Sequence, residues 1–168
     1  MVNSKQKGAS YEREVCVLLS KWLTDGKRED IFWRSAMSGG RATVAAKSGK
    51  QLSNQVGDIT CIDPAGAKFI QAFAVECKHY ANLEFHGLLT GKGKLLGFWE
   101  VIKKEAKNHT KFPILFARQN RLPPMVCFDH CGLAALGIPF RKAILISHQY
   151  DLCIMPVVEF VKLCKPFI

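Results

Sequence analysis

The chain has 168 residues, 48% of them hydrophobic, and contains no apolar run near the roughly 20 residues that span a membrane. A chain of this length is expected to form one domain with its own core. Lysine and arginine number 24 against 14 aspartate and glutamate residues, a net charge of +10, so we expect a polyanionic partner, with nucleic acid ahead of a membrane surface. The N-terminus lacks the apolar segment of an export signal and the 7 cysteines suit a reducing compartment, so we expect a cytoplasmic protein.

The first predicted element is an amphipathic helix that opens at residues 7–10, with Ser10 as its N-cap. Apolar side chains recur at helical spacing, at Tyr11, Val15, Leu18, Leu19 and Trp22. Glu12 and Arg13 lie in the first turn. Glu12 borders the apolar stripe, so its carboxylate can point along the edge of the core toward a sheet. It can equally be a carboxylate that favours the helix dipole.

A short strand is predicted at residues 31–34, followed by a glycine-rich turn at 35–41 and a basic stretch at 41–55 with few large apolar groups. The backbone N–H groups and the guanidinium of this region could bind phosphates, and the basic stretch could become ordered on nucleic acid. A plain surface loop is an equally good interpretation of the turn. The binding candidates in this region are Ser38, Gly39, Gly40, Arg41, Lys47 and Lys50.

Two strands with acidic side chains are predicted next. Asp58 opens an apolar strand, a turn at 63–66 follows, and residues 72–80 form the second strand, in which Glu76 and Lys78 share one face. A hairpin of these strands would bring Asp58 beside Glu76. Two carboxylates at the opening of a sheet suit Mg²⁺ and predict metal-assisted phosphodiester hydrolysis. The alternative is an ion pair that protects a sheet edge.

A crossover unit is predicted after these strands. It consists of a basic loop at 84–94, a helix of about 14 residues from Leu95 and a strand at 112–117. The loop does not have P-loop spacing, so no nucleotide cofactor is expected. The loop and the polar end of the strand add binding candidates, although a solvated turn is the alternative for the last two: Lys92, Lys94, Arg118 and Gln119.

The remaining elements are a strand at 125–128, an irregular or helical stretch to Gly137, a strand at 143–146 and a helix at about 156–164, with Pro156 at its first position. Three residues in this part could form half of a zinc site if further ligands, such as Cys153 or Cys164, come from elsewhere. They are Cys127, His130 and Cys131.

Gly57-Asp58 followed by Glu76-Cys77-Lys78 resembles the motif of PD-(D/E)xK nucleases, with Gly57 in place of the family's usual proline. Residues 7–14 also resemble the opening helix of the archaeal-type Holliday junction resolvases, a branch of that superfamily. The resemblance implies an α/β, restriction-endonuclease-like core, a central mixed β-sheet of four to five strands flanked by α-helices. We expect a single nuclease domain over 1–168, with its core at about 5–120 and a C-terminal extension at about 121–168.

The resemblance also implies a metal site. Asp58, Glu76 and the main-chain carbonyl of Cys77 would bind Mg²⁺, for which Mn²⁺ can substitute. Glu12 would complete the shell directly or through water, and Arg13 follows it in register. Lys78 would orient the attacking water or neutralise the scissile phosphate. The catalytic candidates are therefore Glu12, Asp58, Glu76 and Lys78.

Junction resolvases cut two strands symmetrically, so the resemblance further implies a homodimer that acts on branched or four-way DNA and reads shape and phosphates. Two alternatives stay open. One is a restriction-like, repair or phage genome-processing nuclease that acts on duplex or flap DNA. The other is a non-catalytic basic module that binds nucleic acid. Cellular and phage origins are both compatible with the sequence.

Overall fold

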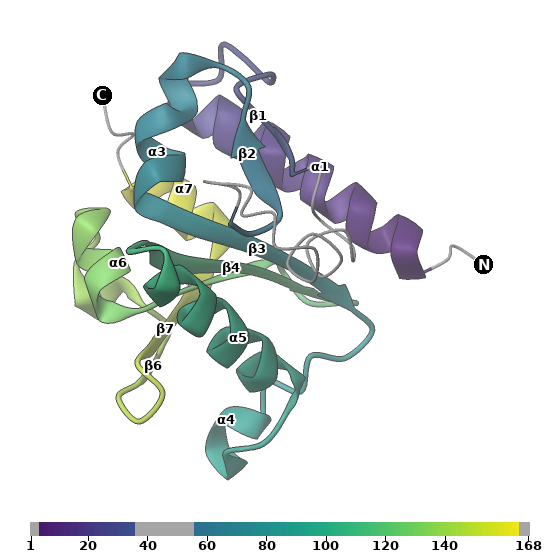
Figure 1. Cartoon of the computed structure of the whole chain (residues 1–168). Coiled ribbons are helices and arrows are strands. Elements are labelled where there is room, and N and C mark those ends of the chain that lie inside the picture. Colours follow the sequence, from purple (N-terminus) through teal and green to yellow (C-terminus); the bar gives the residue numbers. More distant parts are fainter. Residues whose placement is uncertain (1–3, 36–55, 165–168) are drawn as a thin grey trace.

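The computed structural model describes residues 4–35 and 56–164 of the chain (Figure 1). In chain order the elements are α1 (Ser4–Leu23), β1 (Phe32–Arg34), β2 (Ile59–Cys61), the 3-10 turn η1 (Pro64–Gly66), α3 (Ala67–Ala72), β3 (Phe73–Tyr80), α4 (Gly87–Thr90), α5 (Lys94–Asn108), β4 (Phe112–Gln119), β5 (Met125–Phe128), α6 (His130–Ala135), the 3-10 turn η2 (Phe140–Lys142), β6 (Leu145–Ser147), β7 (Leu152–Pro156) and α7 (Val157–Leu163).

The central element is a mixed sheet of five strands in the order β3-β4-β5-β7-β6. β3 and β4 are parallel and are joined by the predicted crossover through α5, whereas the other neighbouring strands are antiparallel. β1 and β2 form a separate two-stranded antiparallel ribbon beside α1 (Figure 1). The predicted α/β fold, with a central mixed β-sheet of four to five strands flanked by α-helices, is confirmed.

The sheet separates two hydrophobic cores. One face packs against α1, α3, α6, α7 and the β1–β2 ribbon, and the other packs against α4 and α5. β3 shows the alternation that this requires, because Phe73 and Val75 enter the first core and Ala74 enters the second. Glu76 and Lys78 continue the Ala74 face toward the end of β3, where both side chains are only half-buried. In the described part of the chain, no helix combines the length and apolar character needed to cross a bilayer.

The predicted hairpin between Asp58 and Glu76 is wrong. β2 pairs with β1, and η1 and α3 separate β2 from β3. Asp63 does not reverse the chain. Its carboxylate accepts a hydrogen bond from the N–H of Ala65 and caps η1, which leads directly into α3. The six residues of α3 are too few to show a helical period in the sequence, so no helix was predicted between the turn at 63–66 and β3.

Two smaller expectations also need correction, and one strand was missed. α1 begins at Ser4, so Ser10 lies inside the helix and is not its cap. Pro156 precedes α7 at the capping position and is not its first helical residue. β7 was not predicted, because its residues Leu152–Pro156 are almost all buried and form a continuous apolar run without alternation.

Phe160 on α7 is expected to be a major contributor to stability. Its side chain is fully buried, and the ring centroids of Trp22, Phe116 and Phe128 lie 5.5, 6.1 and 5.6 Å from its own. Phe160→Ala should lower the free energy of unfolding by about 3–5 kcal/mol. The substitution would leave a cavity between α1, β4 and β5, and these three elements cannot all move in to fill it. Urea denaturation measures this, with the exposed neighbour Val158→Ala as the control. Equal effects of the two substitutions would contradict the prediction.

Candidate active site

Asp58 joins the β1–β2 ribbon to the edge of the main sheet. Its N–H donates to the carbonyl of Val75 over 2.7 Å, and its own carbonyl accepts from the N–H of Ser35 over 2.7 Å. Its carboxylate Oδ2 accepts from the N–H of Cys77 over 2.9 Å. The side chain therefore takes the place of the main-chain acceptor that a further parallel strand would offer to β3.

Gly57 makes this approach possible. It has φ +83 and forms an isolated parallel bridge to Val75, and a Cβ on it would lie 2.3 Å from the Val75 carbonyl oxygen. Only glycine combines that backbone angle with so close an approach. Proline, the usual residue of the resembled motif at this position, is fixed near −65° and could not adopt it.

Glu76 and Lys78, both on β3, lie next to Asp58. The ammonium of Lys78 donates a hydrogen bond to Glu76 Oε1 and lies 4.0 Å from Asp58 Oδ2. The same ammonium lies 5.4 Å from the ring centroid of Phe98 on α5, a cation–π contact that limits where it can move. One cation thus lies between two carboxylates.

The surroundings change the acidity of these groups. Burial, followed by the charge of Glu76, raises the pKa of the Asp58 carboxyl to about 7, against the opposing effects of Lys78 and of the Cys77 N–H. Burial lowers the pKa of Lys78, but the charge and hydrogen bond of Glu76 together with Asp58 outweigh it and hold that pKa above its usual value. The charge of Glu12 also contributes to the raised pKa of Asp58, so α1 lies close to the cluster.

Glu12 is buried on the side of α1 that faces the ribbon, where Arg34 Nε donates to its Oε2 over 2.5 Å. Arg34 was not selected from the sequence. The strand period did indicate where Arg34 points. Residues two apart in a strand share a face, so Arg34 lies on the same, inward face of β1 as the apolar Phe32. Its partner, however, is 22 residues away.

The donor chemistry of the cluster fits a hard divalent cation, since carboxylate and carbonyl oxygens are the preferred ligands of Mg²⁺ and Mn²⁺. The side chains are not gathered into a metal cage. Among residues 4–35 and 56–164, no three His, Cys, Asp or Glu side chains form a group that could hold a metal ion. Glu76 bonds to Lys78 and Glu12 bonds to Arg34, so each would have to be reoriented.

The DNA-binding candidates are distributed unevenly. Arg118 bonds to Glu14 over 2.6 Å and its guanidinium lies 4.4 Å from the ring centroid of Tyr11. Gln119 Oε1 accepts from the N–H of Leu83 over 2.8 Å, so both side chains contact the protein itself. Arg13, Lys92 and Lys94 are exposed. Six candidates lie outside the described residues: Ser38, Gly39, Gly40, Arg41, Lys47 and Lys50.

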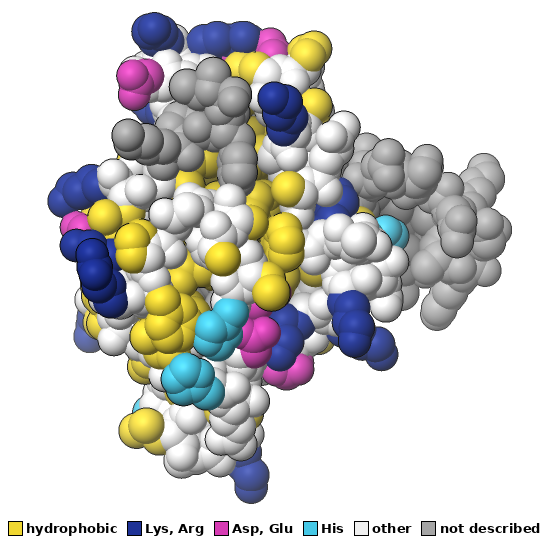
Figure 2. Space-filling view, turned by 90° about the vertical axis from the view of Figure 1, so that its left-hand side faces the viewer, with side chains coloured by type: hydrophobic (Ala, Val, Ile, Leu, Met, Phe, Trp, Pro, Cys, Tyr) yellow, Lys and Arg dark blue, Asp and Glu magenta, His cyan; other side chains and the backbone are white. Residues whose placement is uncertain are grey.

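The suggested zinc ligands do not come together within the described part of the chain. Cys127 is fully buried on the α5 side of the sheet and Cys131 is exposed. His130 hydrogen-bonds with Asp151 and stacks on His148 with ring centroids 5.6 Å apart. Figure 2 shows histidine side chains beside acidic ones on the face that carries α6 and the β6–β7 hairpin.

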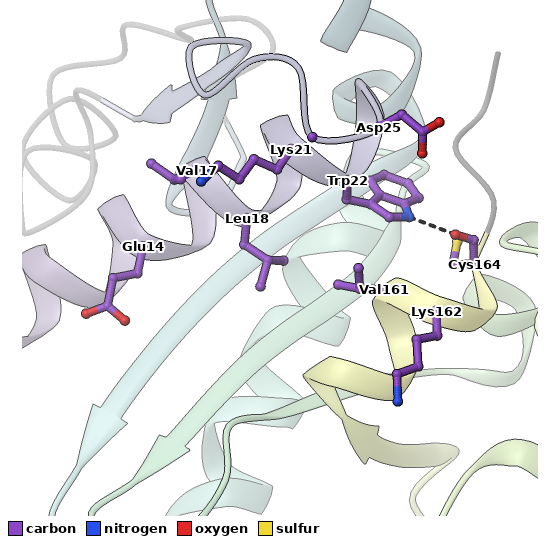
Figure 3. A pocket seen from close by; sticks show the side chains of 10 residues that line it. Glu14, Val17, Leu18, Lys21, Trp22, Asp25, Val161, Lys162 and Cys164 are labelled. Carbon is purple, nitrogen blue, oxygen red and sulfur yellow. Dashed lines mark hydrogen bonds between the residues drawn. The ribbon is translucent and has the colours of Figure 1, made fainter.

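A cavity of about 650 Å³ opens between α1 and α7 (Figure 3). Two of its lining residues are joined by a hydrogen bond, in which Trp22 Nε1 donates to the carbonyl of Cys164 over 2.8 Å. None of the four catalytic candidates lines it, so this cavity and the β3 cluster are separate features. The lining residues are Glu14, Val17, Leu18, Lys21, Trp22, Asp25, Gly26, Val161, Lys162 and Cys164.

The model of the family described as "Phage putative PDDEXK endonuclease" matches residues 3–163. This range contains Glu12, Asp58, Glu76 and Lys78, and also the strands β5, β6 and β7. No curated protein and no solved structure matches the chain.

Gly57→Ala should destabilise the protein more than the matched substitution Gly26→Ala. Both glycines have a positive φ, +83 and +82, but a Cβ at Gly26 meets nothing within 4 Å. Gly26→Ala should cost about 1 kcal/mol from backbone strain alone, and Gly57→Ala about 2–4 kcal/mol, because it also forces β3 and the ribbon apart. Urea denaturation of both variants measures the difference. Equal losses would mean that the close approach to Val75 does not matter for stability.

The raised pKa of Asp58 predicts how stability depends on pH in the presence of a chelator. The folded protein holds this proton up to pH about 7 and the unfolded chain releases it near 3.8. The free energy of unfolding should therefore fall as pH rises between these values, by at most about 1.4 kcal/mol per pH unit.

Asp58→Asn should remove this part of the pH dependence, whereas Asp25→Asn, at an exposed aspartate, should keep it. Urea denaturation at intervals between pH 4.5 and 8 compares the variants. Parallel curves for Asp58→Asn and wild type would refute the raised pKa.

Proposed function

The chain belongs to the family of phage PDDEXK endonucleases, and from this premise we propose that it hydrolyses DNA phosphodiester bonds at the cluster of Asp58, Glu76 and Lys78. The observation that carries the proposal is the position of Lys78. Its ammonium is bonded to one carboxylate and lies 4.0 Å from the other, at the end of β3 where the core gives way to solvent. Carboxylates can hold a metal ion and an ammonium group can bind a phosphate, so this cluster suits phosphoryl chemistry. A DNA backbone can reach it at the surface without a deep cavity.

In the proposed active form Asp58, Glu76 and the main-chain carbonyl of Cys77 would hold a divalent cation, Mg²⁺ with Mn²⁺ as a substitute. Glu12 would complete the shell directly or through water. When bound, the cation offsets the charge that develops on the phosphate and lowers the pKa of a water molecule.

The protein's own groups would do the rest of the work. Lys78 would exchange its bond to Glu76 for one to the attacking water or the scissile phosphate, and the ring of Phe98 would keep the ammonium within reach during that exchange. The Cys77 N–H keeps the Asp58 carboxylate oriented. Glu12 would have to turn from its bond with Arg34 to complete the shell.

We propose branched DNA, above all the four-way junction, as the substrate, and a two-fold homodimer as the assembly that cuts its two strands. The resemblance of residues 7–14 to junction resolvases supports this. Phage genome processing on duplex or flap DNA is the second candidate, favoured by the word "phage" in the family description. The strands β5, β7 and β6 continue the sheet that carries the site, which supports a single nuclease domain.

The proposal predicts metal-dependent cleavage that two substitutions abolish. Glu76→Gln removes a ligand and Lys78→Met removes the ammonium, so each should lower the cleavage rate at least about 100-fold. The exposed Glu29→Gln and Lys107→Met are matched controls that should cut like wild type. The assay uses a labelled four-way junction, flap, linear duplex and single strand with Mg²⁺, Mn²⁺ or chelator.

Two further readouts separate the possible outcomes. Mn²⁺ should raise the melting temperature of wild type but not of Glu76→Gln, because only a folded site binds the metal. Equal cutting of junction and linear duplex would discard the junction specificity and keep the nuclease. Binding of DNA without cleavage under any metal, and without a metal-dependent rise in melting temperature, would favour the non-catalytic module.

A further inference from the structure

Trp33 on β1 is exposed in a way that the other tryptophans are not. Trp22 and Trp99 have exposed fractions of 5% and 0%, and Trp33 has 55%. The indole N–H groups of the two buried residues donate to the carbonyls of Cys164 and Tyr150. Trp33 therefore has a different role from these two core residues.

The strand itself turns this side chain outward. Phe32 and Arg34, on either side of Trp33, face α1, so alternation directs the indole to the opposite face of the ribbon. Its cross-strand neighbour is the small side chain of Thr60. Within residues 4–35 and 56–164, no aromatic ring or cationic group is stacked on the indole. A flat aromatic surface is thus open to a ligand.

Trp33 lies beside the candidate active site. The next residue, Arg34, bonds to Glu12, and the residue after that, Ser35, donates its N–H to the carbonyl of Asp58. Because a strand advances about 3.3 Å per residue, the backbone of Trp33 is about 7 Å along β1 from the point bonded to Asp58. The backbone of Trp33 therefore lies near Asp58 at the rim of the site, with its indole on the face of the ribbon opposite Arg34.

Ile62 also lies on the ribbon, directly after β2, and is exposed, but its side chain is aliphatic and offers no ring for stacking. Leu89 and Val101 lie on α4 and α5, and Ile144 precedes β6 at the far edge of the sheet. Tyr80, at the end of β3, is also exposed, but its ring already packs on Phe98 with centroids 5.2 Å apart. Of the two exposed Phe, Trp or Tyr side chains in the described part of the chain, Trp33 and Tyr80, Trp33 is therefore the one whose ring is open.

We propose that Trp33 stacks on an unpaired DNA base next to the scissile phosphate, and that the enzyme consequently prefers DNA whose base pairs are open at the cut. The proposal rests on the proposed function and names its substrate class. The net charge of +10 favours a polyanion, and nucleobases are the flat groups that a polyanionic substrate brings to this rim. In an intact duplex the base faces are covered by their neighbours, so an indole can stack only on a base that has left the helix.

The requirement for an exposed base face distinguishes among the candidate DNA substrates. Flaps, bubbles and single strands offer unpaired bases, and a four-way junction exposes the faces of its central base pairs when its arms are unstacked, whereas a fully paired linear duplex offers neither. Stacking of one base on an aromatic side chain corresponds to roughly 5- to 150-fold in affinity. Trp33 should therefore increase the affinity for open DNA by this factor and leave the affinity for paired DNA unchanged.

The first experiment measures binding in chelator, where nothing is cut. A labelled duplex with a central bubble and the same duplex fully paired are titrated by fluorescence anisotropy. Trp33→Ala should weaken binding of the bubble roughly 5- to 150-fold and leave the paired duplex unaffected, Trp33→Phe should retain most of the affinity, and Val101→Ala should behave as wild type. Melting temperatures show that each variant is folded.

Tryptophan fluorescence gives an independent readout, because two of the three tryptophans are buried. At equal occupancy, bubble DNA should quench the emission of wild type more than paired DNA does. Trp33→Phe should lose this extra quenching.

The outcomes distinguish the two proposals. Absence of cleavage of any DNA with any metal is a failure of the proposed function. Cleavage with an unchanged preference for bubble DNA in Trp33→Ala overturns the stacking role alone, as does an equal loss of affinity for both DNAs. A shift of Trp33→Ala from dimer to monomer in sedimentation, without a change in DNA affinity, would assign the indole to a second copy of the chain and also overturn the proposal.

Discussion

The hydrogen bond from the Cys77 N–H to the Asp58 carboxylate is the contact on which the site depends. β3 is the edge strand of the five-stranded sheet, so its outer N–H and carbonyl groups need partners. Asp58 supplies them with its own N–H and its carboxylate, while its carbonyl is bonded to β1. A single residue therefore covers the open edge, attaches the β1–β2 ribbon and presents an acidic group next to Glu76. Asp58 thus has both a structural and a proposed chemical role.

That arrangement has an energetic cost, which nearby cations offset. A carboxylate buried beside another carboxylate is destabilised, as the raised pKa of Asp58 reflects. Lys78 lies between the two acids, and Arg34 is paired with Glu12 on the other side. Each cation is held from a different strand, β3 or β1, so the charge balance depends on how the ribbon and the sheet are joined. The site therefore depends on the contact between the ribbon and the main sheet as well as on the two sheets themselves.

The sequence predicted local elements better than long-range contacts. β3 and α5 have clear periods of 2 and 3.6, and both were predicted close to their observed bounds. The pairing of Glu12 with Arg34 and the bridge of Gly57 to Val75 join distant segments and leave no periodic trace. The motif at Asp58, Glu76 and Lys78 was recognised, but the route that brings Asp58 to β3 was not, because it runs through a glycine with positive φ and not through a hairpin. The catalytic roles themselves stay predictions.

Gly57 has a consequence for how this sequence can diverge. Gly57 has φ +83, and a Cβ added to it would lie 2.3 Å from the Val75 carbonyl oxygen, so glycine is the residue that fits this position without strain. The proline of the resembled motif requires a different backbone angle and therefore a different path of the ribbon toward β3. Replacement of Gly57 by proline alone would therefore break the bridge to Val75, and the ribbon would have to approach β3 along another path.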